Sequence, residues 1–163
     1  MKNYLVAAII LAFFFVIGSE KIFVTAEVNG EEQIIKTLEE RRGLQLEINF
    51  IHSVQKTQVI EELEFDGDDF VLRRTKYKSQ GVGLPFLESD GTFREEDGYF
   101  VMDDMNRPVK NLALRTGVGT NMTIKIDGEE IKLYEIFPVG TKIEIRPMSP
   151  FKNFLSSVFG RNF

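Results

Sequence analysis

Apolar and polar residues alternate along several segments of this chain, which is the period of a half-buried β-strand. The apolar residues fall on even positions from Leu44 to Phe50 and on odd positions from Val59 to Phe65. The Asp66–Asp69 turn separates the second segment from a third one, which begins at Phe70. We therefore predict three consecutive antiparallel strands.

The second half of the chain has the same pattern. Residues 122–126 alternate, and Asp127-Gly128 is the dipeptide of a two-residue β-hairpin, followed by Ile131 and Leu133. Short strands are also expected at 99–102, 112–115 and 142–146. For Glu31–Arg42 we leave helix and strand open, because its apolar spacing is helical while Asn29-Gly30 before it resembles a hairpin turn. The fold class is mostly β, an antiparallel sandwich or an open barrel.

An apolar run from Tyr4 to Ile17 follows Lys2 at the start of the chain. As a helix, these about fourteen residues rise ~21 Å, which is shorter than the ~30 Å hydrocarbon core of a bilayer. The run fits a signal peptide or a signal anchor. We expect residues 1–21 to serve this role, 22–148 to form one β domain and 149–163 to form a C-terminal helix. The β domain would lie on the extracytoplasmic side, anchored to the cell membrane or, if the run is cleaved, secreted.

Composition excludes several classes of function. The net charge of -5 includes no basic block that could neutralise a run of phosphates, so nucleic acid is not an expected partner. With no cysteine, the chain has no disulfide, thiolate zinc site or cysteine nucleophile. One histidine does not make a multi-histidine metal site. The acidic turn at 66–69 is explained better as a solvated turn than as a calcium site. We expect neither a metal nor a cofactor.

A polar cluster is predicted on the apolar face of the first three strands. The alternation places His52 on the face of Phe50, and Glu61 on the face of Val59. If the two connecting turns are centred at 56–57 and 67–68, antiparallel pairing sets His52 and Arg74 opposite Glu61. The cluster is either a structural ion pair that fixes the register or a pocket for a small anionic ligand.

Catalysis by this cluster is not expected. His52 and Ser53 suggest a hydrolase, with Glu61 orienting the imidazole. Adjacent strand residues, however, point to opposite faces of a sheet and cannot act together as nucleophile and base.

A glycine-containing loop follows the third strand. Gly81, Gly83, Leu84 and Pro85 allow close approach of the backbone and fix its direction, and a tight turn that closes the β core explains them best. A phosphate-binding loop is not expected, because no helix follows.

Several of these residues also carry a family resemblance. His52-Ser53-Val54, followed by Glu61, the 81–85 loop and Met105-Asn106-Arg107, resembles the bacterial family called domain of unknown function 1850, over about Leu44–Pro147. The resemblance implies a small exported or membrane-anchored protein with no established enzymatic activity, from a family often encoded beside TRAP transporters of the TAXI type. Its pattern covers His52, Ser53, Glu61 and the 81–85 loop; Arg74 comes from the register argument alone.

The C-terminal segment has the spacing of an amphipathic helix, with Lys152, Asn153, Ser156, Ser157 and Arg161 on its polar face. Its apolar positions are Phe151, Phe154, Leu155, Val158 and Phe159. This face suits a membrane surface, a groove on a partner, or the protein's own sheet.

Together these features predict a non-catalytic extracytoplasmic accessory protein. It would be associated with a TRAP-type (TAXI) solute transporter and would bind a transporter component or a small anionic solute. A hydrolase-like enzyme that uses His52 and a purely structural envelope protein are the alternatives.

Overall fold

The computed structural model describes residues 20–81 and 83–148 of the chain. The apolar run at 4–17 and the amphipathic segment at 151–159 lie outside these residues, so both helices remain predictions from sequence. The described elements are β1 Lys21–Val28, β2 Glu31–Glu39, β3 Gln45–Ile51, β4 Gln58–Phe65, β5 Phe70–Tyr77, β6 Thr92–Glu96, β7 Tyr99–Asp103, β8 Arg107–Val109, β9 Leu112–Arg115, β10 Thr123–Ile126, β11 Glu129–Lys132, α2 Leu133–Ile136 and β12 Lys142–Met148.

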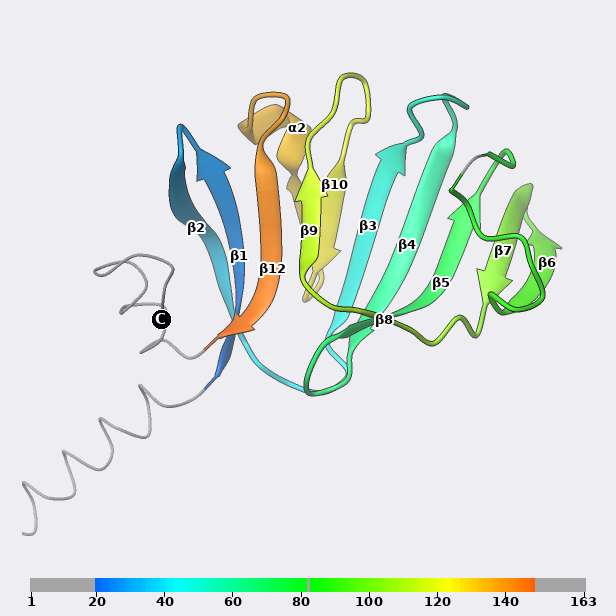
Figure 1. Cartoon of the computed structure of the whole chain (residues 1–163), viewed down its shortest axis with the longest axis horizontal. Helices are drawn as coiled ribbons and strands as arrows, with labels where there is room; N and C mark the ends of the chain where they lie inside the picture. Colours follow the sequence, from blue (N-terminus) through cyan, green and yellow to red (C-terminus); the bar gives the residue numbers. More distant parts are fainter. Residues whose placement is uncertain (1–19, 82, 149–163) are drawn as a thin grey trace, which may run out of the picture.

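The strands form two antiparallel sheets (Figure 1). One has the order β2-β1-β12-β9, and the other has the order β11-β10-β3-β4-β5-β7-β6, with β8 paired to β5. The prediction of a mostly β, antiparallel fold is confirmed, and the sheets do not close into a barrel. The Asp127-Gly128 hairpin also forms as predicted, because β10 and β11 pair on either side of it.

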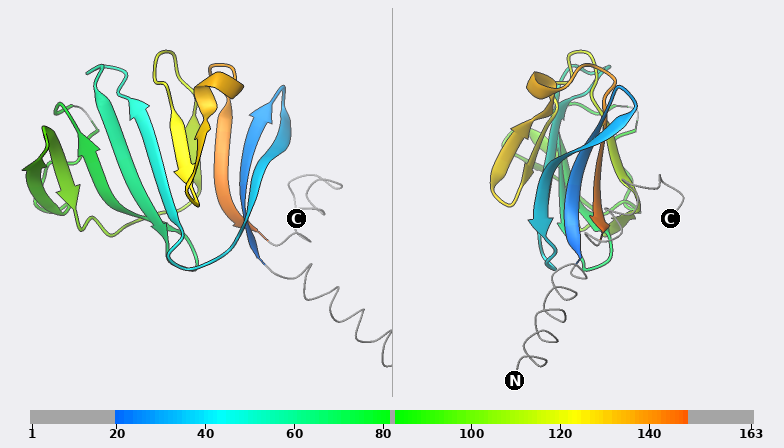
Figure 2. Two further views of the ribbon diagram at one scale, coloured as in Figure 1. Left: turned by 180° about the vertical axis from the view of Figure 1, so that it is seen from behind. Right: turned by 90° about the vertical axis from the view of Figure 1, so that its left-hand side faces the viewer.

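The two sheets share one large apolar core. Alternate residues of β1, such as Ile22 and Val24, belong to the same buried cluster as alternate residues of β3 and β10, such as Ile48 and Ile124. The side view in Figure 2 shows β1 and β12 on the other side of this core from β10 and β11. A smaller cluster of Val59, Tyr77 and Leu84 lies further along the larger sheet. The half-buried Phe50 packs against both clusters.

Two β-bulges interrupt the alternation. Leu72 pairs with Leu63 and Arg74 pairs with Glu62, so Arg73 is an extra residue in β5. In β2, Lys36 pairs with Val24 of β1 and Ile34 pairs with Thr25, so Ile35 is an extra residue in the same way. The segment 31–42, for which helix and strand were left open, is therefore mainly the bulged strand β2.

The termini of the described body lie together. Lys21, the first residue of β1, pairs with Met148, the last residue of β12. The β3–β4 loop and the loops that precede β10 and β12 lie at the opposite end (Figure 1). Within residues 20–81 and 83–148, none of the helices has both the length and the apolar character needed to cross a membrane.

Candidate functional site

The predicted cluster of His52, Glu61 and Arg74 is not assembled. Glu61 pairs with Ile48 on one side and with Thr75 on the other. His52 lies four residues beyond Ile48, which corresponds to about 13 Å along a strand. The extra residue Arg73 shifts the phase of β5, so that Arg74 points to the opposite face and pairs with Glu62 instead. The predicted register is therefore wrong at both partners of Glu61.

His52 instead organises the loop between β3 and β4. Its backbone N–H donates to the carbonyl of Thr57 at 2.8 Å, and Lys56 N–H donates to the His52 carbonyl at 2.9 Å. Its ring nitrogen Nδ1 accepts the N–H groups of Val54 and Gln55 at 3.3 and 3.2 Å. These contacts need an unprotonated Nδ1 and hold the turn in shape. Ser53, the next residue, is exposed at the loop.

Glu61 lies on the inner face of the larger sheet, between the two apolar clusters. Its partners across the sheet, Ile48 and Thr75, are both buried. Burial raises the pKa of Glu61, and the positive charge of Arg107 offsets part of that effect. The carboxyl group therefore lies where its charged form is disfavoured.

Arg74 belongs to a charged network on the outer face of the larger sheet. It pairs with Glu62 at 3.2 Å and with Asp103. Asp103 also accepts a hydrogen bond from Arg94 at 2.5 Å, and Lys76 pairs with Glu62 at 2.8 Å. Burial acts to raise the pKa of Asp103, but the hydrogen bonds from the two arginines outweigh it and hold that pKa below its ordinary value.

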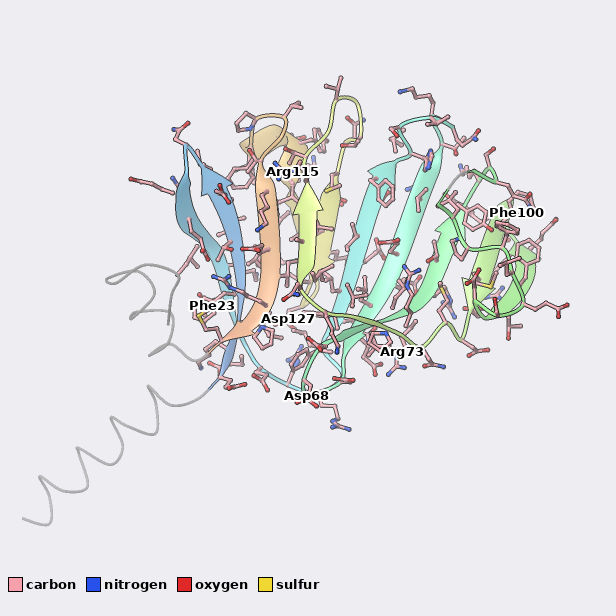
Figure 3. All side chains as sticks on the ribbon, viewed as in Figure 1. Phe23, Asp68, Arg73, Phe100, Arg115 and Asp127 are labelled. Atoms are coloured by element: carbon pink, nitrogen blue, oxygen red, sulfur yellow. The ribbon has the colours of Figure 1, made fainter. Side chains whose placement is uncertain are left out.

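A shallow depression of about 500 Å³ lies beside this network, lined by four acids, two arginines and two amides. Arg73, labelled in Figure 3, projects at its border and pairs with Glu64 at 3.1 Å. Because carboxylates already contact both arginines, the depression offers no uncompensated cation to an anionic ligand. Sequence reasoning missed this network. Its signal was the charge that alternates with the apolar positions of β4 and β5.

The loop of Gly81, Gly83, Leu84 and Pro85 closes the smaller core cluster. Leu84 packs against Val59 and Tyr77, and the Tyr77 hydroxyl donates to the Pro85 carbonyl at 2.5 Å. Gly83 has a φ of +86°. This supports the interpretation of the loop as a turn that covers the β core.

Gly81 also joins this loop to the His52 turn. A Cβ added at Gly81 would lie 2.8 Å from the Cγ atom of Gln55, whose N–H donates to His52. The two sequence motifs, about 30 residues apart, thus meet at one end of the larger sheet.

Four loops form a continuous edge at this end, which we call the loop edge: residues 52–57, 78–81 with 83–85, 116–121 and 137–141. Ile51 N–H donates to the Thr120 carbonyl at 2.6 Å, and Gly140 N–H donates to the Thr116 carbonyl at 2.8 Å. Figure 3 shows Arg115 just below this edge and Asp68 at the opposite end of the molecule. Among its described residues, the edge exposes three valines, Val54 at 70%, Val118 at 79% and Val139 at 62%.

The acidic turn is stabilised by its own backbone. Asp66 Oδ1 accepts the N–H groups of Asp68 and Asp69 at 2.9 and 3.1 Å, and these bonds lower the pKa of Asp66. Across the described part of the chain, no three His, Asp or Glu side chains are placed to hold a metal ion together.

Comparison with known proteins identifies the family. The model of the family described as Domain of unknown function (DUF1850) matches residues 46–133, more than half of the chain. The chain belongs to this family. The match spans β3 to the start of α2 and includes the His52 turn, Glu61 and the 81–85 loop. No curated protein and no solved structure matches the chain.

Proposed function

We propose that this protein is a non-catalytic extracytoplasmic accessory protein, anchored to the cell membrane by its N-terminal apolar run, that binds a protein component of a TRAP-type (TAXI) transporter. The loop edge is the observation that supports this proposal most directly. There, the motif at His52 and the loop that contains Gly81 lie against each other, and apolar side chains project into solvent.

The arrangement favours binding over catalysis. The Nδ1 atom of His52 accepts two backbone N–H groups of its own turn. Glu61 is on the inner face of the sheet, at the register position of Ile48 rather than of His52. Glu61, the acid expected to orient the imidazole, therefore does not lie beside His52.

A protein partner is favoured over a small anionic solute. The guanidinium of Arg74, expected to meet an anion, contacts Glu62 and Asp103. Exposed valines on neighbouring loops suit the apolar centre of a protein interface instead. The N-terminal apolar run precedes β1 in the sequence, and β1 begins at the end of the molecule opposite the loop edge. Anchoring through this run would therefore direct the loop edge away from the bilayer.

Co-purification from the native membrane tests this function. The tagged protein is compared with a Val54→Ser, Val118→Ser double variant and with Ile34→Ser, which changes an exposed isoleucine of β2 outside the loop edge. We expect transporter subunits to accompany the unchanged protein and the Ile34 variant but not the double variant. Recovery of no transporter subunit with the unchanged protein would refute the proposal.

A further inference from the structure

Phe23 is buried on a face of β1 where the shared core does not reach. Its neighbours Ile22 and Val24 point into that core, so Phe23 points to the outer face of the four-stranded sheet. An aromatic ring on the open face of a sheet is normally well exposed, yet Phe23 is only 4% exposed.

Short or charged side chains surround Phe23 on the two neighbouring strands. Its partner on β2 is Thr37, and its partner on β12 is Arg146. The terminal nitrogens of Arg146 contact Glu32 and Glu144, while its Nε atom is buried without a hydrogen-bond partner among the described residues. Both Phe23 and Nε are thus shielded from water on a face that no described strand covers.

The last described residue, Met148, lies close to Phe23. Met148 pairs with Lys21, two residues before Phe23 on the same strand, which is about 7 Å along β1. Phe151 follows Met148 by three residues, and three extended residues reach about 10 Å. Phe151, the first apolar position of the segment, is therefore within reach of Phe23.

We propose that the C-terminal segment Phe151–Phe159 docks its apolar face on the outer face of the four-stranded sheet, over Phe23 and Arg146. The amphipathic spacing suits a membrane surface, a groove on a partner or the protein's own sheet, and this proposal selects the protein's own sheet. The proposal is independent of the function proposed above.

Tryptophan fluorescence tests this docking, because the chain contains no tryptophan of its own. Phe154→Trp is introduced into the full chain, which is reconstituted into vesicles of phosphatidylcholine and phosphatidylglycerol in equal parts. Ser157→Trp, on the polar face, is the matched control. We expect blue-shifted emission from the Phe154→Trp variant that lipids brominated in their acyl chains do not quench, and red-shifted emission from the Ser157→Trp variant.

A second substitution links the signal to the sheet. Phe23→Leu in the Phe154→Trp background is expected to shift the emission to the red while circular dichroism still reports a folded β domain. Quenching of the Phe154→Trp emission by brominated lipid would overturn the proposal in favour of a membrane surface. Red-shifted emission from the Phe154→Trp single variant, or no response to the added Phe23→Leu, would also overturn it.

Discussion

Replacing Glu61 by glutamine should stabilise the protein at neutral pH and not at acidic pH. Glu61 faces the interior between the buried Ile48 and Thr75, and burial raises its pKa. Below the ordinary carboxyl pKa of about 4.3, both the folded and the unfolded chain carry a protonated Glu61. As the pH rises, the unfolded chain loses this proton first, so folding becomes less favourable until the folded state also ionises. Glutamine has no such penalty.

The size of the effect follows from the surroundings of Glu61. An uncompensated buried polar group costs about 1–3 kcal/mol, more if charged. We expect the lower end, about 1 kcal/mol, because the side chain keeps some contact with solvent and the charge of Arg107 acts in its favour. For a domain of this size, that corresponds to a melting temperature about 3 °C higher for the variant at neutral pH.

Thermal unfolding followed by circular dichroism, in steps from about pH 4 to about pH 8 so as to bracket the carboxyl pKa, measures this difference. Glu95→Gln, at an exposed position of β6, is the matched control and should leave the pH profile unchanged. Equal stability of wild type and Glu61→Gln at every pH would refute the burial argument. Lower stability of the variant at neutral pH would show instead that the charged carboxylate is favourably paired.

Three further predictions concern the network and the loop. Asp103→Asn should destabilise the protein by about 2 kcal/mol, since Asp103 accepts two charged hydrogen bonds. Because the pKa of Asp103 is lowered in the folded state, the wild type loses this advantage as the pH falls. An unchanged urea midpoint of the variant would contradict this prediction. Tyr77→Phe should cost about 1 kcal/mol and speed hydrogen exchange at the Leu84 amide; unaltered exchange would count against it. Gly81→Ala should lower the melting temperature, because the added Cβ would clash with the side chain of Gln55. Adding Gln55→Ala to this variant should restore the melting temperature. No recovery in the double variant would exclude the contact between the two residues.

Alternation was sufficient to predict the strands that keep a constant phase. In β3, in β10 and in the part of β4 next to the Asp66–Asp69 turn, every second residue faces the core without interruption. The apolar residues at these positions are therefore visible as a pattern in the sequence. The predicted turn centre at 67–68 was also right next to the turn, because Phe65 pairs with Phe70 and Leu63 pairs with Leu72.

The errors arise from bulges, which a single sequence does not reveal. An extra residue at Arg73 reverses the facing of Arg74 and removes it from the predicted cluster. The extra Ile35 in β2 brings Ile34, Ile35 and Leu38 into a spacing that resembles a helix. Neither position carries a glycine or proline that would have marked the irregularity.

The turn after His52 was misplaced for a related reason. Lys56 takes a left-handed conformation, with φ of +54°, at a position where glycine or asparagine would have indicated the turn. The turn is consequently centred two residues earlier than expected, and the register of Glu61 moves with it.

Photo-crosslinking from the loop edge in native membranes tests the central claim most directly. A photoreactive amino acid replaces Val118 on the loop edge or, as control, Asp68 on the exposed turn at the opposite end of the molecule. We predict that position 118 captures a TRAP-type transporter subunit and that position 68 does not. Absence of a transporter subunit from the products at position 118, or equal capture from both positions, would contradict the account.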